Sequence, residues 1–276
     1  MFGAIAGDII GSPYRDEKPD ADFPILTENS RVTEITVMTL AVAEALMRTM
    51  RKPGVKFTDE RFRHEVIYWM KAFGKKSKKI SFGRKFQRWL NSPRPRAYGT
   101  SSNGAALRVS PIAWAFDNLE DVEKYAEIAA GVTHNTDEGI KYARTVAGMV
   151  FLARMKKDKD DIKTYFEEKT GLTLSKTIEE IRPGFEFKTS CPETVPAAVT
   201  AFLEGNDFEE AVRKAVSLGG ETNATASMAG AIAEALLGIK ILIESRAFEI
   251  LDRRLKFYVE KWEQWKPINL PTCSAD

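Results

Sequence analysis

Apolar residues recur at spacings of three and four along most of this chain, which is the period of an amphipathic helix. Thr58 is a suitable N-cap for one such helix, in which Phe62, Val66 and Met70 share a face. Evidence for strands is thin, since no two alternating segments are joined by a hairpin turn. The pattern predicts helices from residue 58 and over residues 36–50, 103–116, 121–132, 138–154, 196–203, 208–217, 222–237 and 248–262.

Gly, Pro, Ser and Asn concentrate at residues 11–32, 91–102 and 182–193, which are therefore expected to be loops. None of these segments is long or biased enough to separate two domains, and no internal repeat is visible. We expect a single all-α domain over residues 1–276, with its long loops converging on one face.

The composition narrows the class of protein further. A hydrophobic content of 43% is ordinary for a globular chain. No apolar run reaches the roughly 18 residues of a membrane span, and no basic segment precedes the apolar N-terminus, as it would in a secretory signal. Cys191 and Cys273 provide neither a disulfide framework nor metal-ligand spacing. These features predict a reduced, cytoplasmic setting without a membrane.

The charge is unevenly distributed. Residues 71–96 carry ten Lys or Arg and no Asp or Glu, although the net charge of the whole chain is only +2. This segment is either an anion-binding patch for phosphates, a nucleic acid or an acidic partner, or a solvated face, and the solvated face is the commoner outcome. Phe82, Phe86 and Trp89 recur at spacings of four and three, so they are expected to face the core rather than to stack on bases.

Four segments, in this order, carry a resemblance to a known family. They are residues 3–14 (Gly-Ala-Ile-Ala-Gly-Asp, then Gly-Ser-Pro-Tyr), 103–111 (Asn-Gly-Ala-Ala-Leu-Arg-Val-Ser-Pro), 133–139 (Thr-His-Asn, then Glu-Gly) and 190–197 (Ser-Cys, then Val-Pro-Ala). Together they resemble the ADP-ribosylglycohydrolase family, related to dinitrogenase reductase-activating glycohydrolase. The resemblance implies a compact orthogonal helical bundle whose cleft lies between loops and helix N-termini.

Two further segments resemble the metal-binding segments of that family, with the aspartates replaced. In the family, Thr-Asp-Asp-Thr and Gly-Gly-Asp-x-Asp-Thr hold two magnesium ions. The matching positions here are Thr33, Glu34, Ile35, Glu221, Asn223 and Ala224. Four formal negative charges fall to two, and Mg²⁺ demands near-ideal oxygen geometry. We therefore expect the degenerate positions Thr33, Glu34, Glu221 and Asn223 to hold no metal, and expect no cofactor. Magnesium is expected only if the chain is an active enzyme.

A glutamate of the metal site is also replaced. Arg15 stands after Tyr14, where many members of the family have a glutamate that can orient water. A one-residue shift that brings Asp16 to this place is the less favoured alignment. Arg15 and Glu34 are therefore the candidates for the catalytic positions. A guanidinium between Glu34 and Glu221 would stabilise a site without ions, whereas two unpaired glutamates would repel and raise a pKa.

The ligand-binding segments are better preserved. The resemblance implies that backbone N–H groups of two glycine-containing turns cradle a diphosphate at helix starts. Close packing of helices through small residues explains the same glycines equally well. His134 is either a structural hydrogen-bonding residue or a catalytic one. The candidate ligand-binding residues are Ser102, Asn103, Gly104, His134, Gly219 and Gly220.

Three functions follow from these observations. The first is a diverged ADP-ribosylglycohydrolase homologue that is catalytically impaired and binds ADP-ribose or a related nucleotide, as a binding or regulatory protein. The second is an active hydrolase of ADP-ribosyl glycosidic bonds, in which Glu34 and Glu221 hold one metal. The third is a scaffold that uses its basic 71–96 surface to bind a partner and has no small ligand. The count of ligand carboxylates favours the first function over the second.

Overall fold

The computed structural model describes residues 1–50 and 57–266. In these ranges the chain forms α-helices and short 3₁₀ helices, and the only β-type pairing is an isolated antiparallel bridge between Ser102 and Ser190. The α-helices are α1 (Phe2–Gly11), α2 (Glu34–Met50), α3 (Asp59–Lys76), α4 (Arg84–Asn91), α5 (Leu119–Gly131), α6 (Asp137–Arg154), α7 (Lys159–Thr170), α8 (Ile178–Ile181), α9 (Cys191–Glu204), α10 (Phe208–Ser217), α11 (Thr222–Leu237), α12 (Ile241–Ile250) and α13 (Arg253–Trp265). The all-α prediction is confirmed.

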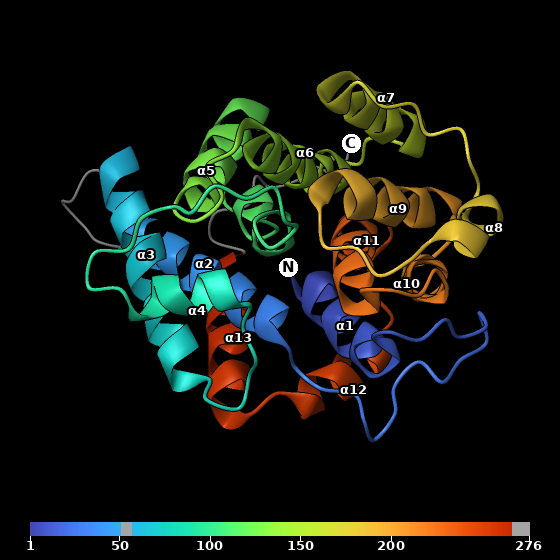
Figure 1. Cartoon of the computed structure of the whole chain (residues 1–276), viewed down its shortest axis with the longest axis horizontal. Coiled ribbons are helices and arrows are strands. Elements are labelled where there is room, and N and C mark those ends of the chain that lie inside the picture. Colours follow the sequence, from blue (N-terminus) through green and yellow to red (C-terminus); the bar gives the residue numbers. More distant parts are fainter. Residues whose placement is uncertain (51–56, 267–276) are drawn as a thin grey trace.

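The centre of the bundle is the pair α1 and α11, which lie side by side in Figure 1. Every residue of α1 is buried. Gly3, Gly7 and Gly11 recur at a spacing of four on the side that faces α11, and none of the three has room for a side chain. A Cβ on Gly7 would lie 2.2 Å from the carbonyl oxygen of Ala226. The glycines therefore let the two backbones approach directly.

Two polar contacts fix the register of this pair. At one end, the carboxylate of Glu234 accepts hydrogen bonds from the backbone N–H groups of Phe2 and Gly3, at 3.0 and 2.8 Å. These are donors that a helix start leaves without an intrahelical partner. At the other end, the Thr222 hydroxyl donates to the carbonyl oxygen of Gly11 at 2.7 Å. The start of α11 is thus held beside the end of α1.

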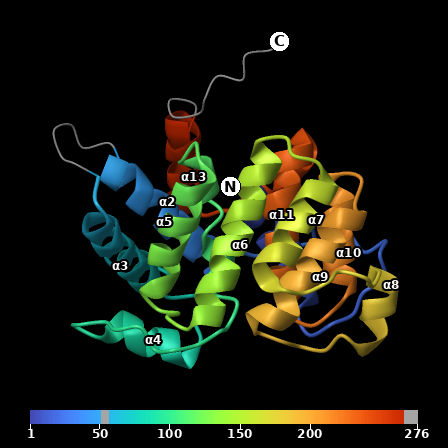
Figure 2. The same cartoon turned by 90° about the horizontal axis from the view of Figure 1, so that it is seen from above.

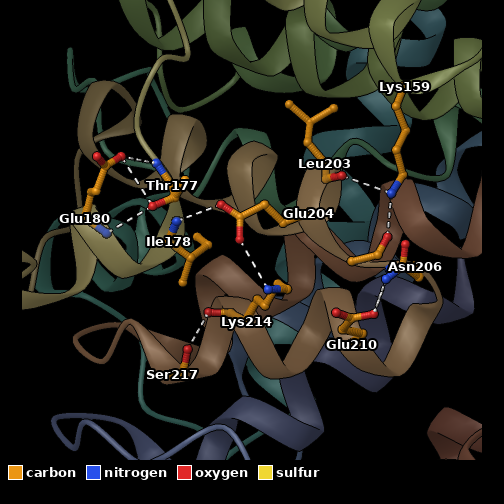
Figure 3. Close-up of polar contacts among 11 residues, drawn as sticks. Lys159, Thr177, Ile178, Glu180, Leu203, Glu204, Asn206, Glu210, Lys214 and Ser217 are labelled. Atoms are coloured by element: carbon orange, nitrogen blue, oxygen red, sulfur yellow. Dashed lines mark hydrogen bonds and ion pairs between the residues drawn. The ribbon is translucent and has the colours of Figure 1, made fainter.

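Helices α5, α6, α7 and α9 lie across the face of the bundle that Figure 2 shows, and α10 packs against α9. Their ends are joined by side chains that reach between helices, as Figure 3 shows for α8, α9 and α10. Glu204, at the end of α9, accepts a hydrogen bond of 2.7 Å from the backbone N–H of Ile178 and pairs with Lys214 at 3.2 Å. Thr177 and Glu180 form a capping box at the start of α8.

Several predicted boundaries were wrong. Residues 103–116 do not form one α-helix but contain two 3₁₀ turns, Ala106–Arg108 and Ile112–Trp114. Pro111 lacks the N–H group that a continuous helix would need there. Residues 248–262 are likewise divided between α12 and α13, because Asp252 caps a new helix by accepting from the N–H of Leu255.

Other helices lay outside the predicted set, which did not include α1, α4, α7 or α8. Helix α9 begins at Cys191, five residues before its predicted start, and contains Pro196. Cys191 itself is buried, whereas Cys273 lies outside the described residues. Among the described residues, no helix is long and apolar enough to cross a membrane.

Replacing Gly7 by Ala should destabilise the protein by about 1–3 kcal/mol, because its methyl group would overlap backbone atoms that have no room to move. The midpoint of urea unfolding measures this change. Gly131→Ala is the matched control, since nothing lies within 4 Å of a Cβ at that helical position. The control should be neutral or stabilising by less than about 1 kcal/mol. Equal midpoints for the two variants would contradict the close approach of α1 and α11.

Candidate functional site

A pocket opens between the start of α2, the segment around α4 and the 103–108 turn. Its volume is about 130 Å³. An engineered apolar cavity of about 150 Å³ holds a benzene ring, so this pocket has room for one ring-sized group. The wall carries aromatic and apolar side chains together with two carboxylates. The lining includes Glu34, Ile35, Phe82, Phe86, Tyr98 and Glu221.

The buried side chain of Asp8 contacts the start of α2, where Glu34 and Ile35 line the pocket. It accepts hydrogen bonds from the backbone N–H and hydroxyl of Thr33, at 3.1 and 2.5 Å, and from those of Thr36, at 3.2 and 2.6 Å. Burial raises the pKa of Asp8, and these hydrogen bonds oppose the shift. Asp8 is thus a carboxylate on α1 that holds the first turn of α2. Asp8 was not among the predicted site residues, although it ends the Gly-Ala-Ile-Ala-Gly-Asp motif.

Thr33 and Asn223 meet at the same carboxylate. The side-chain amide of Asn223 lies 3.3 Å from the Asp8 Oδ1 and 3.3 Å from the Thr33 Oγ1. The Asn223 Oδ1 is buried without a hydrogen-bond partner among the described residues. Two of the four predicted metal positions are therefore brought together, with the Thr33 hydroxyl donating to Asp8.

The other contact joins Arg15 and Glu221. The Arg15 Nη2 lies 3.4 Å from the Glu221 Oε1, and the Asn103 side-chain amide donates to the Glu221 Oε2 at 2.7 Å. The Arg15 guanidinium also lies over the ring of Phe187, 5.3 Å from its centroid. The structure therefore places a permanent positive charge against one of the two retained carboxylates.

Both glutamates of the pocket favour the protonated state more than free glutamate does. Burial raises the pKa of Glu221 to about 7, although Asn103 and Arg15 oppose the shift. Burial also raises the pKa of Glu34, and the Asp8 charge adds to the increase. Glu34 is the first residue of α2 and lines the pocket beside Ile35, whose side chain offers no oxygen ligand.

His134 is held between two hydroxyl groups. Its Nδ1 lies 2.7 Å from the Thr133 Oγ1, and its Nε2 lies 2.9 Å from the Ser102 Oγ. Burial and the neighbouring Arg108 lower the pKa of His134 to about 2, so the imidazole is neutral. Arg108 donates to the carbonyl oxygen of Gly104 and to the Thr133 hydroxyl. These contacts favour the structural interpretation of His134, although its ring still lines the pocket.

One backbone N–H group in each turn predicted to cradle a phosphate already donates to a carbonyl oxygen of the chain. The N–H of Asn103 donates to the carbonyl oxygen of Thr189, and that of Gly219 to the carbonyl oxygen of Val216. Gly219 and Gly220 have φ of +82° and +69°, which favour glycine, and neither is among the residues that line the pocket. The Gly220 carbonyl accepts from the N–H of Asp16, so this turn holds the segment that carries Arg15.

The residues at the expected metal positions do not fit a pair of magnesium ions. Among the described residues, no group of three His, Cys, Asp or Glu side chains is placed to hold a metal ion. The oxygens of Asp8 receive hydrogen bonds from Thr33, Thr36 and Asn223. Glu221 faces a guanidinium, which would repel a divalent cation.

Comparison with known proteins identifies the family of this chain. The sequence matches the ADP-ribosylglycohydrolase family over residues 1–260, so the chain belongs to that family. It is similar to mouse ADP-ribosylhydrolase ARH3, with 25% identity over 89% of this chain and 84% of the mouse protein. It is also similar to an uncharacterised protein of Archaeoglobus fulgidus, with 26% identity over 84% of this chain and 76% of that protein.

A solved structure supports the same architecture. A chain described as an ADP-ribosylglycohydrolase-related protein complex superimposes with a TM-score of 0.67, at 22% identity, and covers 96% of this chain and 95% of its own. At that identity the likeness supports the all-α fold and nothing finer.

The raised pKa of Glu221 predicts a pH-dependent loss of stability. Its ordinary pKa is 4.5 and its pKa in the fold is about 7, so the native state binds the proton more tightly. That contribution is complete below pH 4.5 and is lost as the pH rises to about 7. Relative to Glu221→Gln, the wild type should lose up to about 3 kcal/mol of unfolding free energy across this window.

Urea unfolding of both proteins at several pH values measures the difference. Glu186→Gln is the control, because that side chain is 79% exposed. The difference in unfolding free energy between Glu186→Gln and the wild type should change little with pH. A wild type that instead gains stability over Glu221→Gln as the pH rises would show that Arg15 dominates and keeps Glu221 ionised.

Proposed function

We propose that this chain is a catalytically impaired member of the ADP-ribosylglycohydrolase family that binds ADP-ribose or a related nucleotide without a metal pair. The ion pair between Arg15 and Glu221 is the observation that carries the proposal. It places a fixed cation where the resemblance implies divalent ions. Ile35 and Asn223 remove two further carboxylates from the same site.

The proposal includes a retained binding pocket. The rings of Phe82, Phe86 and Tyr98 offer apolar surface to one ring of a nucleotide. Glu34 and Glu221 can accept hydrogen bonds from ribose hydroxyls. Arg15, which pairs with Glu221, can offset the negative charge of a phosphate bound beside it. A volume of about 130 Å³ suits one ring, so the remainder of the nucleotide would lie outside the pocket.

Impaired catalysis follows from the same substitutions. In this family, as the resemblance implies, magnesium ions take part in hydrolysis of the glycosidic bond. Loss of metal-bound water removes a nucleophile that is available at neutral pH, together with several kcal/mol of transition-state stabilisation. Without metal-bound water, Glu221 offers a pKa of about 7, but Arg15 and Asn103 already bind its two oxygens.

Binding should be visible as thermal stabilisation. ADP-ribose at roughly 100 times its Kd should stabilise the fold by about 2.7 kcal/mol, and EDTA should leave the rise in Tm unchanged. Arg15→Ala should weaken binding by roughly tenfold, about 1.4 kcal/mol, because Glu221 then faces the ligand with no cation beside it. Calorimetry of wild type and variant measures both effects.

The control for that measurement is Arg246→Ala, which removes an exposed arginine of α12 that does not line the pocket. It should bind ADP-ribose as the wild type does. A flat Tm across millimolar ADP-ribose, with no heat of binding, would reject the nucleotide-binding function and leave the scaffold interpretation.

Hydrolysis gives an independent test. We expect no measurable release of ADP-ribose from modified arginine or serine, with or without millimolar Mg²⁺. The matched protein restores the family's residues through Arg15→Glu, Glu34→Asp, Ile35→Asp, Glu221→Asp, Asn223→Asp and Ala224→Thr. Mg²⁺-dependent release by that protein alone would support the proposal. Turnover by the unmodified chain at about 1 s⁻¹ or faster would establish the active-hydrolase alternative instead.

A further inference from the structure

A second surface of the molecule is dominated by positive charge. Of the ten Lys and Arg of residues 71–96, nine are exposed: Lys75, Lys76, Lys78, Lys79, Arg84, Lys85, Arg88, Arg94 and Arg96. We refer to these nine residues as the basic surface. It covers the end of α3, the following loop, α4 and the segment after α4. Figures 1 and 2 show α3 and α4 together at the edge of the bundle.

The cations of the basic surface have no carboxylate partner in the part of the chain that the structure describes. Among residues 1–50 and 57–266, no carboxylate lies within 4.0 Å of any of the nine. Exposed cations elsewhere do have such partners, for example Lys124 with Asp59 at 2.9 Å and Lys240 with Asp207 at 2.8 Å. The charge of the basic surface is therefore available to a ligand, whereas exposed cations elsewhere on the protein form ion pairs.

The sequence of α4 separates its charged face from its apolar face. Trp89 and Leu90 are buried, and the Trp89 indole donates to the carbonyl oxygen of Val132 at 2.9 Å. Phe86 stacks on Trp89 with ring centroids 5.5 Å apart. Because these contacts anchor the inner face, the outer face presents Arg84 and Arg88 on a rigid element.

Residues of the basic surface line two grooves. One, of about 440 Å³, lies on the outer side of α4 and is lined by Arg84, Gln87 and Arg88. The other, of about 590 Å³, is lined by Lys76, Lys78 and Lys79 together with Arg31 and Arg254. Asp252 also lines the second groove, but its carboxylate accepts from the N–H of Leu255 at 2.8 Å as a helix cap.

The kind of partner follows from what the basic surface lacks. Protein interfaces are enriched in aromatic and apolar anchors and depleted in Lys. None of the large hydrophobic side chains exposed among the described residues lies within residues 71–96. Arg84 and Arg88 lie one helical turn apart, with Cβ atoms about 5–6 Å from each other, and can each bind a phosphate through a guanidinium fork. Repeated phosphates match this surface better than a folded acidic protein does.

We infer that the basic surface binds the phosphodiester backbone of a nucleic acid, with Lys76, Lys78, Lys79, Arg84 and Arg88 as the principal phosphate contacts. The neutralised phosphates release counterions, so the affinity falls steeply as the salt concentration rises. This inference is independent of the nucleotide pocket, since none of these five residues lines it.

The test measures fluorescence anisotropy of labelled oligonucleotides bound to the full chain at several salt concentrations. Single-stranded RNA, single-stranded DNA and duplex DNA distinguish the sources of the phosphodiester chain. The test variant is Lys78→Gln, Lys79→Gln, Arg84→Gln and Arg88→Gln combined. For a single strand it should bind more than tenfold more weakly at 0.1 M salt, with a slope of log K against log salt that is shallower by about 2–3 units.

The control removes four exposed cations from other surfaces, as Lys124→Gln, Lys157→Gln, Lys240→Gln and Arg246→Gln combined. It changes the net charge equally and should bind within about twofold of the wild type, and thermal unfolding confirms that both variants fold. Equal losses in the two variants, or no salt-dependent binding to any oligonucleotide, would overturn the inference. If poly-glutamate of matched charge displaced the labelled oligonucleotide as well as unlabelled RNA does, the partner would be an acidic protein and the inference would be wrong. If free ADP-ribose displaced the oligonucleotide fully, the oligonucleotide would bind at the pocket and not at the basic surface, which would overturn the inference.

Discussion

The direct contact between the backbones of α1 and α11 is the constraint on which the rest of this structure depends. Three glycines on α1 remove the side chains that would otherwise separate the helices. The approach brings Gly11 against Thr222, so the loop that carries Arg15 leaves α1 beside the start of α11. Asp8, on the same short helix, holds the first turn of α2. A single buried helix thereby positions both segments that resemble metal-binding motifs.

The carboxylates of this site are offset by neighbouring groups of the chain itself. Clustered carboxylates would repel one another in a buried position. Here the charge is reduced by Ile35 and Asn223, Asp8 is saturated with hydrogen-bond donors, and Glu221 is paired with Arg15 and Asn103. Hydrogen-bond donors and the Arg15 guanidinium thus stabilise the carboxylates of Asp8 and Glu221 within the chain. This stabilisation is why the proposed function is a binding protein that keeps the family's fold.

The pocket and the basic surface share one structural element. The segment around α4 turns Phe82 and Phe86 toward the pocket and Arg84 and Arg88 toward solvent. Since Phe82 is buried and Phe86 partly buried, the expectation that these rings face inward rather than into solvent agrees with the structure. Their ring faces nevertheless contribute to the pocket wall, which periodicity alone could not reveal.

The sequence by itself determined the helical class, since spacings of three and four dominate, and its ordered motifs indicated the family. It also predicted an altered metal site, because Ile35 and Ala224 offer no oxygen ligand in any fold, where the resemblance implies an aspartate and a threonine. Only the tertiary structure decided that Arg15 reaches Glu221, that Asp8 lies under Thr33, and that Gly219 and Gly220 support a turn instead of lining the pocket. These contacts join residues up to 206 positions apart. Local propensity carries no information about such pairs, because they form only when α1, α2 and α11 pack together.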